Sequence, residues 1–98
     1  FFQSNCEGEV VTCLHNCYFN SYDGAVINPG AHTHYSYAIY DAIKAIAPIP
    51  VVEVHISDIH SREAFRQVSV TAPACVAQIA GKGYDGYFEA VKLLADLK

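Results

Sequence analysis

The sequence predicts an α/β domain in which a parallel sheet is covered by helices on both faces. Two patterns support this prediction: segments of strand character alternate with segments of helical periodicity, and the strand segments are nearly all apolar. Consecutive parallel strands need a crossover between them, usually a helix, and strands buried on both faces lose the polar alternation of half-exposed strands. A chain of 98 residues has room for one hydrophobic core, so residues 1–98 are expected to form a single domain.

Four strands are expected from short, apolar, β-branched runs that end at turn residues. The second strand stops at Asn28-Pro29-Gly30, because proline cannot continue a central strand and glycine permits a sharp turn. The third strand follows Pro50 and ends near Ser57. The four expected strands comprise residues 1–5, 24–27, 51–57 and 75–80.

Four helices are expected from apolar residues that recur at spacings of three and four. Ser4 or Asn5 would cap the first helix, and Pro48 would end the second. The four expected helices comprise residues 7–18, 34–47, 61–67 and 86–97. The side chains expected to face the core are Val10, Val11, Leu14 and Tyr18 in the first helix, Ala38, Ile39, Ala42, Ile43 and Ile46 in the second, and Val91, Leu94 and Leu97 in the last.

The composition is that of a globular protein, with 52% apolar residues, 16% charged residues and a net charge of -4. This acidic balance argues against nucleic acid or an anionic membrane as a partner. No apolar run approaches the roughly 20 residues that a membrane-spanning helix needs, so a soluble, cytoplasmic protein is expected. Because the chain starts at Phe1, without methionine and inside an expected strand, we expect an amino-terminally incomplete domain.

The cysteines, Cys6, Cys13, Cys17 and Cys75, show neither a CxxC pair nor the density of a disulfide scaffold. Cys13 and Cys17 would lie one helical turn apart, a spacing that suits half of a metal site, but His15 between them would point away. Free thiols in a reducing compartment are the preferred interpretation, and no metal site is predicted.

Two ionisable side chains interrupt the third expected strand. Glu53 and His55 lie two residues apart, so both project from the same face of the strand near its carboxyl end. A carboxylate or an imidazole buried there without a partner would be strongly destabilising. The two side chains are therefore expected to pair, either as a satisfied structural pair or as part of a functional site.

Other unusual polar groups also follow the ends of expected strands, where ligands bind in open parallel sheets. Asn28 offers a side-chain amide, and His34 lies at the expected start of a helix. The backbone N–H groups of Ile56 and Ser57 lie where the chain leaves the sheet, so they are expected to be free to bind a carboxylate. Taken singly, each of these residues also has a structural interpretation as a turn, a cap or a solvated side chain.

Three charged residues extend this candidate site. Arg62 and Arg66 lie four residues apart on the expected short helix, so one is expected to clamp an anion while the other pairs locally, unless both are simply exposed. Asp41 lies seven residues after His34, about 10 Å further along the expected helix, and one small ligand cannot contact both. Any polar role of Asp41 is therefore expected to involve a neighbouring subunit, although a solvated aspartate is the default interpretation.

The segment Gly81-Lys82-Gly83-Tyr84-Asp85-Gly86 fits the GxGxxG pattern of dinucleotide-binding folds. Too few residues follow it for a second strand with a ribose-binding acid, so a tight turn is expected and nucleotide binding is the weakest functional interpretation. No phosphate loop, nucleophile elbow or HExxH pair occurs. The histidine, carboxylate, amide and guanidinium groups at the expected strand ends suit acid–base chemistry on a small, anionic, polyhydroxylated substrate.

Eight segments carry a family resemblance when they are taken together. They are Phe2-Gln3-Ser4-Asn5, Glu7-Gly8-Glu9, Ile27-Asn28-Pro29-Gly30-Ala31, Thr33-His34, Asp41-Ala42, Glu53-Val54-His55-Ile56-Ser57, Arg62-Glu63-Ala64-Phe65-Arg66 and Gly86-Tyr87. In this order, over essentially the whole chain, the sequence resembles type II 3-dehydroquinate dehydratase. The resemblance implies a flavodoxin-like, three-layer domain that lacks the family's first strand, lid loop and first helix.

The resemblance also implies a reaction: dehydration of 3-dehydroquinate to 3-dehydroshikimate through an enolate, without a metal or cofactor, in aromatic biosynthesis or quinate breakdown. His55 would be the general acid and Glu53 would orient its ring. The family assembles as trimers, four of which form a dodecamer, and Asp41 would reach a neighbouring subunit. The remaining substrate-binding residues implied by the resemblance are Asn28, Gly30, Ala31, His34, Ile56, Ser57 and Arg66.

The sequence departs from the family pattern in several places. The family's tyrosine base lies on the lid, which none of the 98 residues matches, and the missing strand would lie between the first two strands expected here. Asp58 replaces the usual asparagine, Tyr35 a small residue, and Val68 and Val70 polar or aromatic residues. The alternative function is a non-catalytic relative that binds a small anion or serves in assembly.

Overall fold

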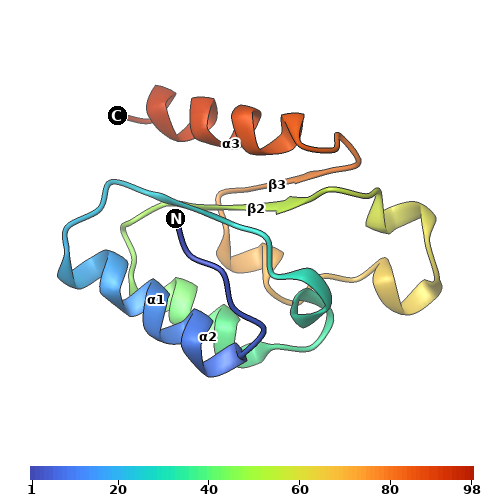
Figure 1. Ribbon diagram of the computed structural model, residues 1–98, viewed down its shortest axis with the longest axis horizontal. Helices are drawn as coiled ribbons and strands as arrows, with labels where there is room; N and C mark the ends of the chain where they lie inside the picture. Colours follow the sequence, from blue (N-terminus) through green and yellow to red (C-terminus); the bar gives the residue numbers. More distant parts are fainter.

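The computed structural model describes residues 1–98 and has three layers (Figure 1). The central layer is a parallel sheet in the order β1-β2-β3, formed by β1 (Ala25–Ile27), β2 (Val51–His55) and β3 (Ala77–Ala80). Helices α1 (Glu7–Phe19) and α2 (Tyr37–Ala45) cover one face of the sheet, and α3 (Asp85–Asp96) covers the other (Figure 1). The predicted parallel sheet with helices on both faces is confirmed.

The central strand β2 is buried along its whole length, because it contacts a neighbouring strand on each side and helices on each face. Val51 packs with Leu14 and Ile39 in the core between the sheet and helices α1 and α2. Val52 and Val54 pack on the opposite side with Ala90 of α3. Each face of a β-strand receives alternate side chains, so one short apolar run supplies both cores. None of the helices is both long enough and apolar enough to span a lipid bilayer.

The second expected helix is divided in the structure. Gly30–His34 forms a 3-10 helix, and α2 begins only at Tyr37. Ser36 is the N-cap of α2, since its side chain accepts a hydrogen bond from the backbone N–H of Ile39 at 3.0 Å. The expected start at His34 was therefore wrong. His34 belongs to a turn at the carboxyl end of the sheet.

Two predicted elements were wrong. Residues 1–5 form no strand, because β1 is hydrogen-bonded only to β2 and no strand lies beside the first residues. Residues 61–67 form no α-helix; two short 3-10 turns, Ile59–Ser61 and Ala64–Arg66, flank Arg62 in an extended conformation. A segment of this length forms too few hydrogen bonds to offset the cost of helix nucleation.

Several details of the predicted helices also differ. The N-cap of α1 is Cys6 instead of Ser4 or Asn5, and Ser4 accepts a hydrogen bond from the Cys6 N–H at 3.0 Å. On α3, Gly86 and Ala90 are buried, and a Cβ at Gly86 would lie 3.1 Å from a methyl group of Val54. This close approach turns the small residues of α3 toward the sheet. The predicted core residues that are exposed are Tyr18, Ala38, Val91 and Leu97.

Two matched substitutions test this assignment of the core. Val52→Ala is expected to lower the free energy of unfolding by roughly 2 kcal/mol, because Val52 has no exposed surface and the change leaves a cavity in the central strand. Val91→Ala removes the same methyl groups from an exposed position of α3, so its effect should stay within about 0.5 kcal/mol. Urea denaturation measures both, and equal losses would contradict the burial pattern.

Candidate active site

A pocket of about 230 Å³ opens at the carboxyl end of the sheet. It is formed by the loop after β1, the end of β2 with its following loop, and the two 3-10 turns beyond it. The residues that line it are Asn28, Gly30, Ala31, His34, His55, Ile56, Ser57, Ile59, Arg62 and Arg66. All of the predicted site residues except Glu53 and Asp41 therefore meet at this pocket.

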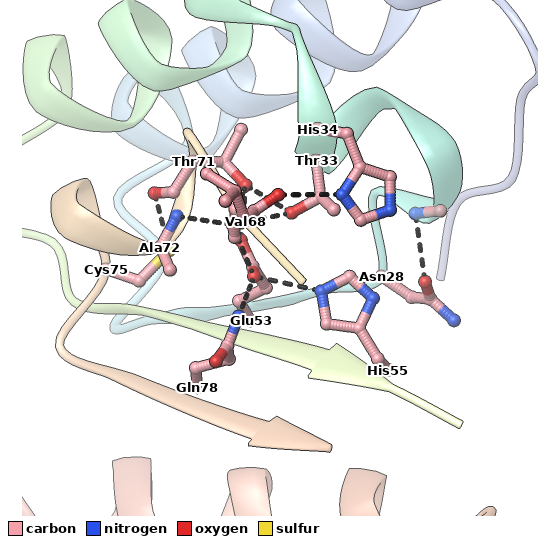
Figure 2. A network of polar contacts seen from close by, with 12 residues as sticks. Asn28, Thr33, His34, Glu53, His55, Val68, Thr71, Ala72, Cys75 and Gln78 are labelled. Carbon is pink, nitrogen blue, oxygen red and sulfur yellow. Dashed lines mark hydrogen bonds and ion pairs between the residues drawn. The ribbon is translucent and has the colours of Figure 1, made fainter. Parts of the chain in front are cut away.

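Glu53 and His55 form a hydrogen-bonded pair at the base of the pocket (Figure 2). His55 Nε2 lies 2.9 Å from Glu53 Oε2, and the exposed fractions of the two residues are 5% and 0%. An ionised carboxylate can only accept hydrogen bonds, so Nε2 carries a proton and donates a hydrogen bond to Glu53 Oε2. Nδ1 is then the ring nitrogen that remains for a ligand.

Three further side chains donate hydrogen bonds to the Glu53 carboxylate (Figure 2). Thr71 Oγ1 donates to Oε1, whereas Ser69 Oγ and Gln78 Nε2 donate to Oε2 at 2.9 Å and 2.8 Å. Burial alone would raise the pKa of Glu53, but the hydrogen bonds from His55, Thr71, Gln78 and Ser69 together lower it from an ordinary value of 4.5 to about 2. Glu53 is therefore ionised at neutral pH.

Thr33 connects this carboxylate site to the 3-10 helix after β1. Its Oγ1 lies 2.7 Å from Thr71 Oγ1 and 2.8 Å from Ser69 Oγ. Because Thr71 and Ser69 give their hydroxyl hydrogens to Glu53, Thr33 is the donor in this group and gives its single hydroxyl hydrogen to one of them. The backbone N–H of Val70 also donates to the carbonyl oxygen of Thr33 at 2.7 Å. The segment that precedes β3 is thereby attached to the wall of the pocket.

His34 and Asn28 are held by hydrogen bonds in the pocket wall. His34 Nδ1 lies 2.8 Å from the carbonyl oxygen of Val68, which can only accept, so Nδ1 carries a proton. Asn28 accepts a hydrogen bond from the Gly30 N–H at 3.0 Å and donates from Nδ2 to the hydroxyl of Tyr87 at 2.8 Å. These partners fix the orientation of both side chains before any ligand binds.

The glycine-rich turn supports the backbone that follows β2. Gly81 and Gly83 have φ values of +78° and +56°, a conformation that favours glycine. The Gly81 N–H donates to the carbonyl oxygen of Ser57 at 3.2 Å, and the Gly83 N–H donates to that of Ile56 at 3.1 Å. The predicted tight turn is confirmed, and these donors are already used within the chain, contrary to the nucleotide interpretation. The hydrogen bonds of the loops include none donated by the backbone N–H groups of Ile56 and Ser57.

The two arginines differ in their local contacts, although both line the pocket. Arg66 Nε donates to the Glu63 carboxylate at 2.5 Å, and its guanidinium carbon lies 4.8 Å from the centre of the Phe65 ring. Arg62 Nη1 lies 3.4 Å from Ser57 Oγ. Glu63 is more than half exposed, so its ion pair with Arg66 contributes little and can exchange for a bound anion.

Asp41 does not belong to the pocket. It is exposed on α2, whereas His34 lies in the preceding 3-10 helix. The expectation that the two lie on one helix was wrong, because Ser36 separates the two elements. Asp41 contributes nothing to the lining of the pocket, so a ligand bound there would not contact it within one chain.

Two of the cysteines have raised pKa values, and none belongs to a cluster of metal ligands. Burial, and to a lesser degree the charge of Glu53, raise the pKa of Cys75 to about 12, so its thiol is neutral at physiological pH. Burial and the neighbouring Cys13 raise the pKa of Cys17. No group of three or more histidine, cysteine, aspartate or glutamate side chains is arranged to hold a metal ion.

Sequence reasoning missed the donors that surround Glu53. Ser69, Thr71 and Gln78 are far from Glu53 in the sequence and meet it only because β3 pairs with β2. One signal was available: Gln78 is the single polar residue in an otherwise apolar strand. The hydrogen bond from Asn28 to Tyr87 joins residues 59 positions apart, and no local pattern indicates it.

The lowered pKa of Glu53 predicts how stability depends on pH. A folded-state pKa near 2, against an ordinary value of 4.5, contributes about 3 kcal/mol that is fully present above pH 4.5 and is lost as the pH falls through about 2. Free energies of unfolding measured between pH 7 and pH 2 should show this loss. The Glu53→Gln variant removes the titrating group, so the difference in free energy of unfolding between the unsubstituted protein and the variant should shrink as the pH falls over that range. A difference that stays constant with pH would contradict the lowered pKa of Glu53.

Comparisons with known proteins identify the family of this chain. The family model described as class II dehydroquinase matches residues 1–95. A 3-dehydroquinate dehydratase from Clostridium beijerinckii is 62% identical over 93 residues, which are 95% of this chain and 63% of that relative's length. The crystal structures of type II dehydroquinases from Butyrivibrio crossotus and Propionibacterium acnes are similar to this chain, with TM-scores of 0.94 and 0.88 and identities of 52% and 38%. The similarity covers 95% and 97% of this chain and 64% of each of those chains. With a family match over nearly all of its residues and these identities, the chain belongs to the class II dehydroquinase family.

Proposed function

We propose that this protein dehydrates 3-dehydroquinate to 3-dehydroshikimate, the reaction that gives its relatives their name. The observation that carries the proposal is the buried Glu53–His55 pair, whose ring opens into a pocket beside Asn28, His34 and Arg66. A small polyhydroxylated carboxylate needs hydrogen-bond partners for its hydroxyls, donors for its carboxylate and an acid for its leaving group. The pocket offers all three.

The binding roles follow from the groups that line the pocket. The free backbone N–H groups of Ile56 and Ser57 bind the substrate carboxylate, because an anion gains most from donors that have no other partner. Asn28 and His34 bind the hydroxyl groups. Arg66 exchanges its exposed partner for the substrate, while Gly30 and Ala31 shape the wall where the ring lies.

The proposed acid is His55 with its exchangeable proton on Nδ1. A base removes a proton from C2 of the substrate, and the C–H electron pair enters the neighbouring carbonyl group as an enolate. When the enolate reforms the carbonyl group, the hydroxyl on the adjacent carbon departs, and it leaves as water by taking the proton from His55. Glu53 holds Nε2–H throughout, so the ring that gives up the Nδ1 proton carries a proton on each nitrogen before the transfer. In the family the base is a tyrosine on a lid, and we assign the same base to the whole protein.

We further propose that the protein acts as a homo-oligomer, with trimers that assemble into a dodecamer. Asp41 is exposed on α2 and lies outside the pocket of its own chain. In a trimer, this carboxylate contributes to the substrate site of the adjacent subunit.

Removal of the acid tests the proposed reaction. His55→Ala is expected to lower kcat by roughly two to four orders of magnitude, because the hydroxyl would have to leave without a proton. The ultraviolet absorbance of the conjugated enone product measures turnover, and size-exclusion chromatography checks that assembly is unchanged. Normal turnover by the variant would remove His55 from the mechanism.

Substitution of Asp41 tests the contribution from the neighbouring subunit. Asp41→Ala is expected to raise KM several-fold while the fold remains intact, because the side chain is exposed in its own chain. Mixed oligomers that combine Asp41→Ala chains with His55→Ala chains place an intact Asp41 beside an intact His55 only across an interface. Recovery of activity in the mixture supports this arrangement, whereas its absence would show that Asp41 acts within its own chain.

One observation favours a second candidate function. Two arginines and two histidines line the pocket, beside backbone N–H groups that form no other hydrogen bond, and this set of donors suits a bound anion. Without a base, the same groups would hold a small anion and not convert it, as in the non-catalytic relative considered above. Calorimetric titration of the protein with 3-dehydroquinate, followed by assay for the enone, separates the two functions: heat of binding without product formation supports the binding module.

A further inference from the structure

Gln78 is the single polar residue of β3. The register of the parallel pair places Gln78 opposite Glu53, so the two side chains lie on the same face of the sheet. Gln78 Nε2 donates to Glu53 Oε2 at 2.8 Å (Figure 2). Oε2 is also the oxygen that accepts the hydrogen bond from His55 Nε2. One amide thus contacts the atom that orients the imidazole.

The orientation of this amide is determined by a second histidine. The carboxylate of Glu53 only accepts hydrogen bonds, so the NH2 group of Gln78 must face it and Oε1 must face the opposite way. Oε1 lies 3.2 Å from Nε2 of His60, which therefore donates to it. His60 is exposed in the turn after β2, and its backbone N–H donates to Asp58 Oδ1 at 3.1 Å. A hydrogen-bonded chain runs from this surface turn to the buried carboxylate.

We propose that Gln78 is a positioning residue for the Glu53–His55 pair and that His60 orients Gln78 for this role. The inference rests on the proposed function, because it concerns the acid of that reaction. Without the donor from Gln78, Oε2 keeps only the hydrogen bonds from Ser69 and His55, and the carboxylate is held less firmly. His55 is then oriented less strictly, and its ring protons are no longer restricted to a single arrangement.

This role is separable from substrate binding. Neither Gln78 nor His60 lines the pocket, so neither contacts the proposed substrate. A change at Gln78 should therefore alter how often His55 is ready to transfer its proton while leaving substrate affinity in place. In kinetic terms, kcat falls and KM does not.

The first test replaces Gln78 by methionine, which has a similar length and no donor. In the full-length protein, Gln78→Met is expected to lower kcat about tenfold and to leave KM within about twofold. The nitrogen NMR spectrum of His55 provides a readout that does not depend on activity. Neutral His55 should carry its proton only on Nε2 in the unsubstituted protein and should populate both tautomers in the variant.

The second test uses His60, whose exposure makes its variants compatible with folding. His60→Phe removes the donor to Gln78. It should lower kcat less than Gln78→Met does and should also give both tautomers of His55. His60→Gln restores an N–H group at the position of Nε2 and should recover turnover. This matched pair keeps the proposal testable even if Gln78→Met fails to fold.

The outcomes distinguish this inference from the proposed function. A pure Nε2–H tautomer in Gln78→Met, or equal kcat values for His60→Phe and His60→Gln, would overturn the positioning role. A loss confined to KM would do the same, because it would mean that Gln78 acts on binding. If the unsubstituted protein forms no product, the proposed reaction fails, and the tautomer spectra alone then decide whether Gln78 and His60 position His55.

Discussion

A buried carboxylate determines how the carboxyl end of this sheet is organised. Glu53 has no exposed surface, and an ion in that position is destabilising unless hydrogen bonds replace its lost solvation. Four side chains provide these bonds, and they come from β2, from the segment before β3 and from β3 itself. All of these segments must be in place at once for the charge to be tolerated. The same requirement therefore stabilises the fold and fixes the geometry of His55.

The parts of the site that depend on local geometry could be predicted from the sequence. Glu53 and His55 were expected to pair because side chains two positions apart on a strand share a face, whatever surrounds the strand. Ser69, Thr71 and Gln78 could not be predicted in this way. Their contact with Glu53 depends on which strand pairs with β2 and in which register, and no local pattern specifies either.

The errors in the predicted fold also arise from tertiary contacts that no local sequence pattern specifies. The small side chains of α3 allow a close approach to Val54, and that tertiary contact decides which face of the helix is buried, placing Val91 in solvent despite its apolar side chain. The segment 61–67 has helical spacing but is too short to form an α-helix without strong packing, and it forms 3-10 turns instead. Sequence patterns indicated the three strands and three α-helices that exist, while packing determined their ends and their orientation and left residues 1–5 and 61–67 without the predicted elements.

The hydrogen bonds around Glu53 also determine the direction in which a proton can move. A carboxylate that already accepts four hydrogen bonds would lose at least one of them on protonation, which is why its pKa lies near 2. Glu53 is therefore a poor acceptor for the proton of His55, and the proton on Nε2 stays where it is. The only exchangeable position left on the ring is Nδ1, the nitrogen available to the pocket. Thus Glu53 orients the ring without competing for the proton, and proton transfer in the proposed reaction is directed from His55 toward the substrate.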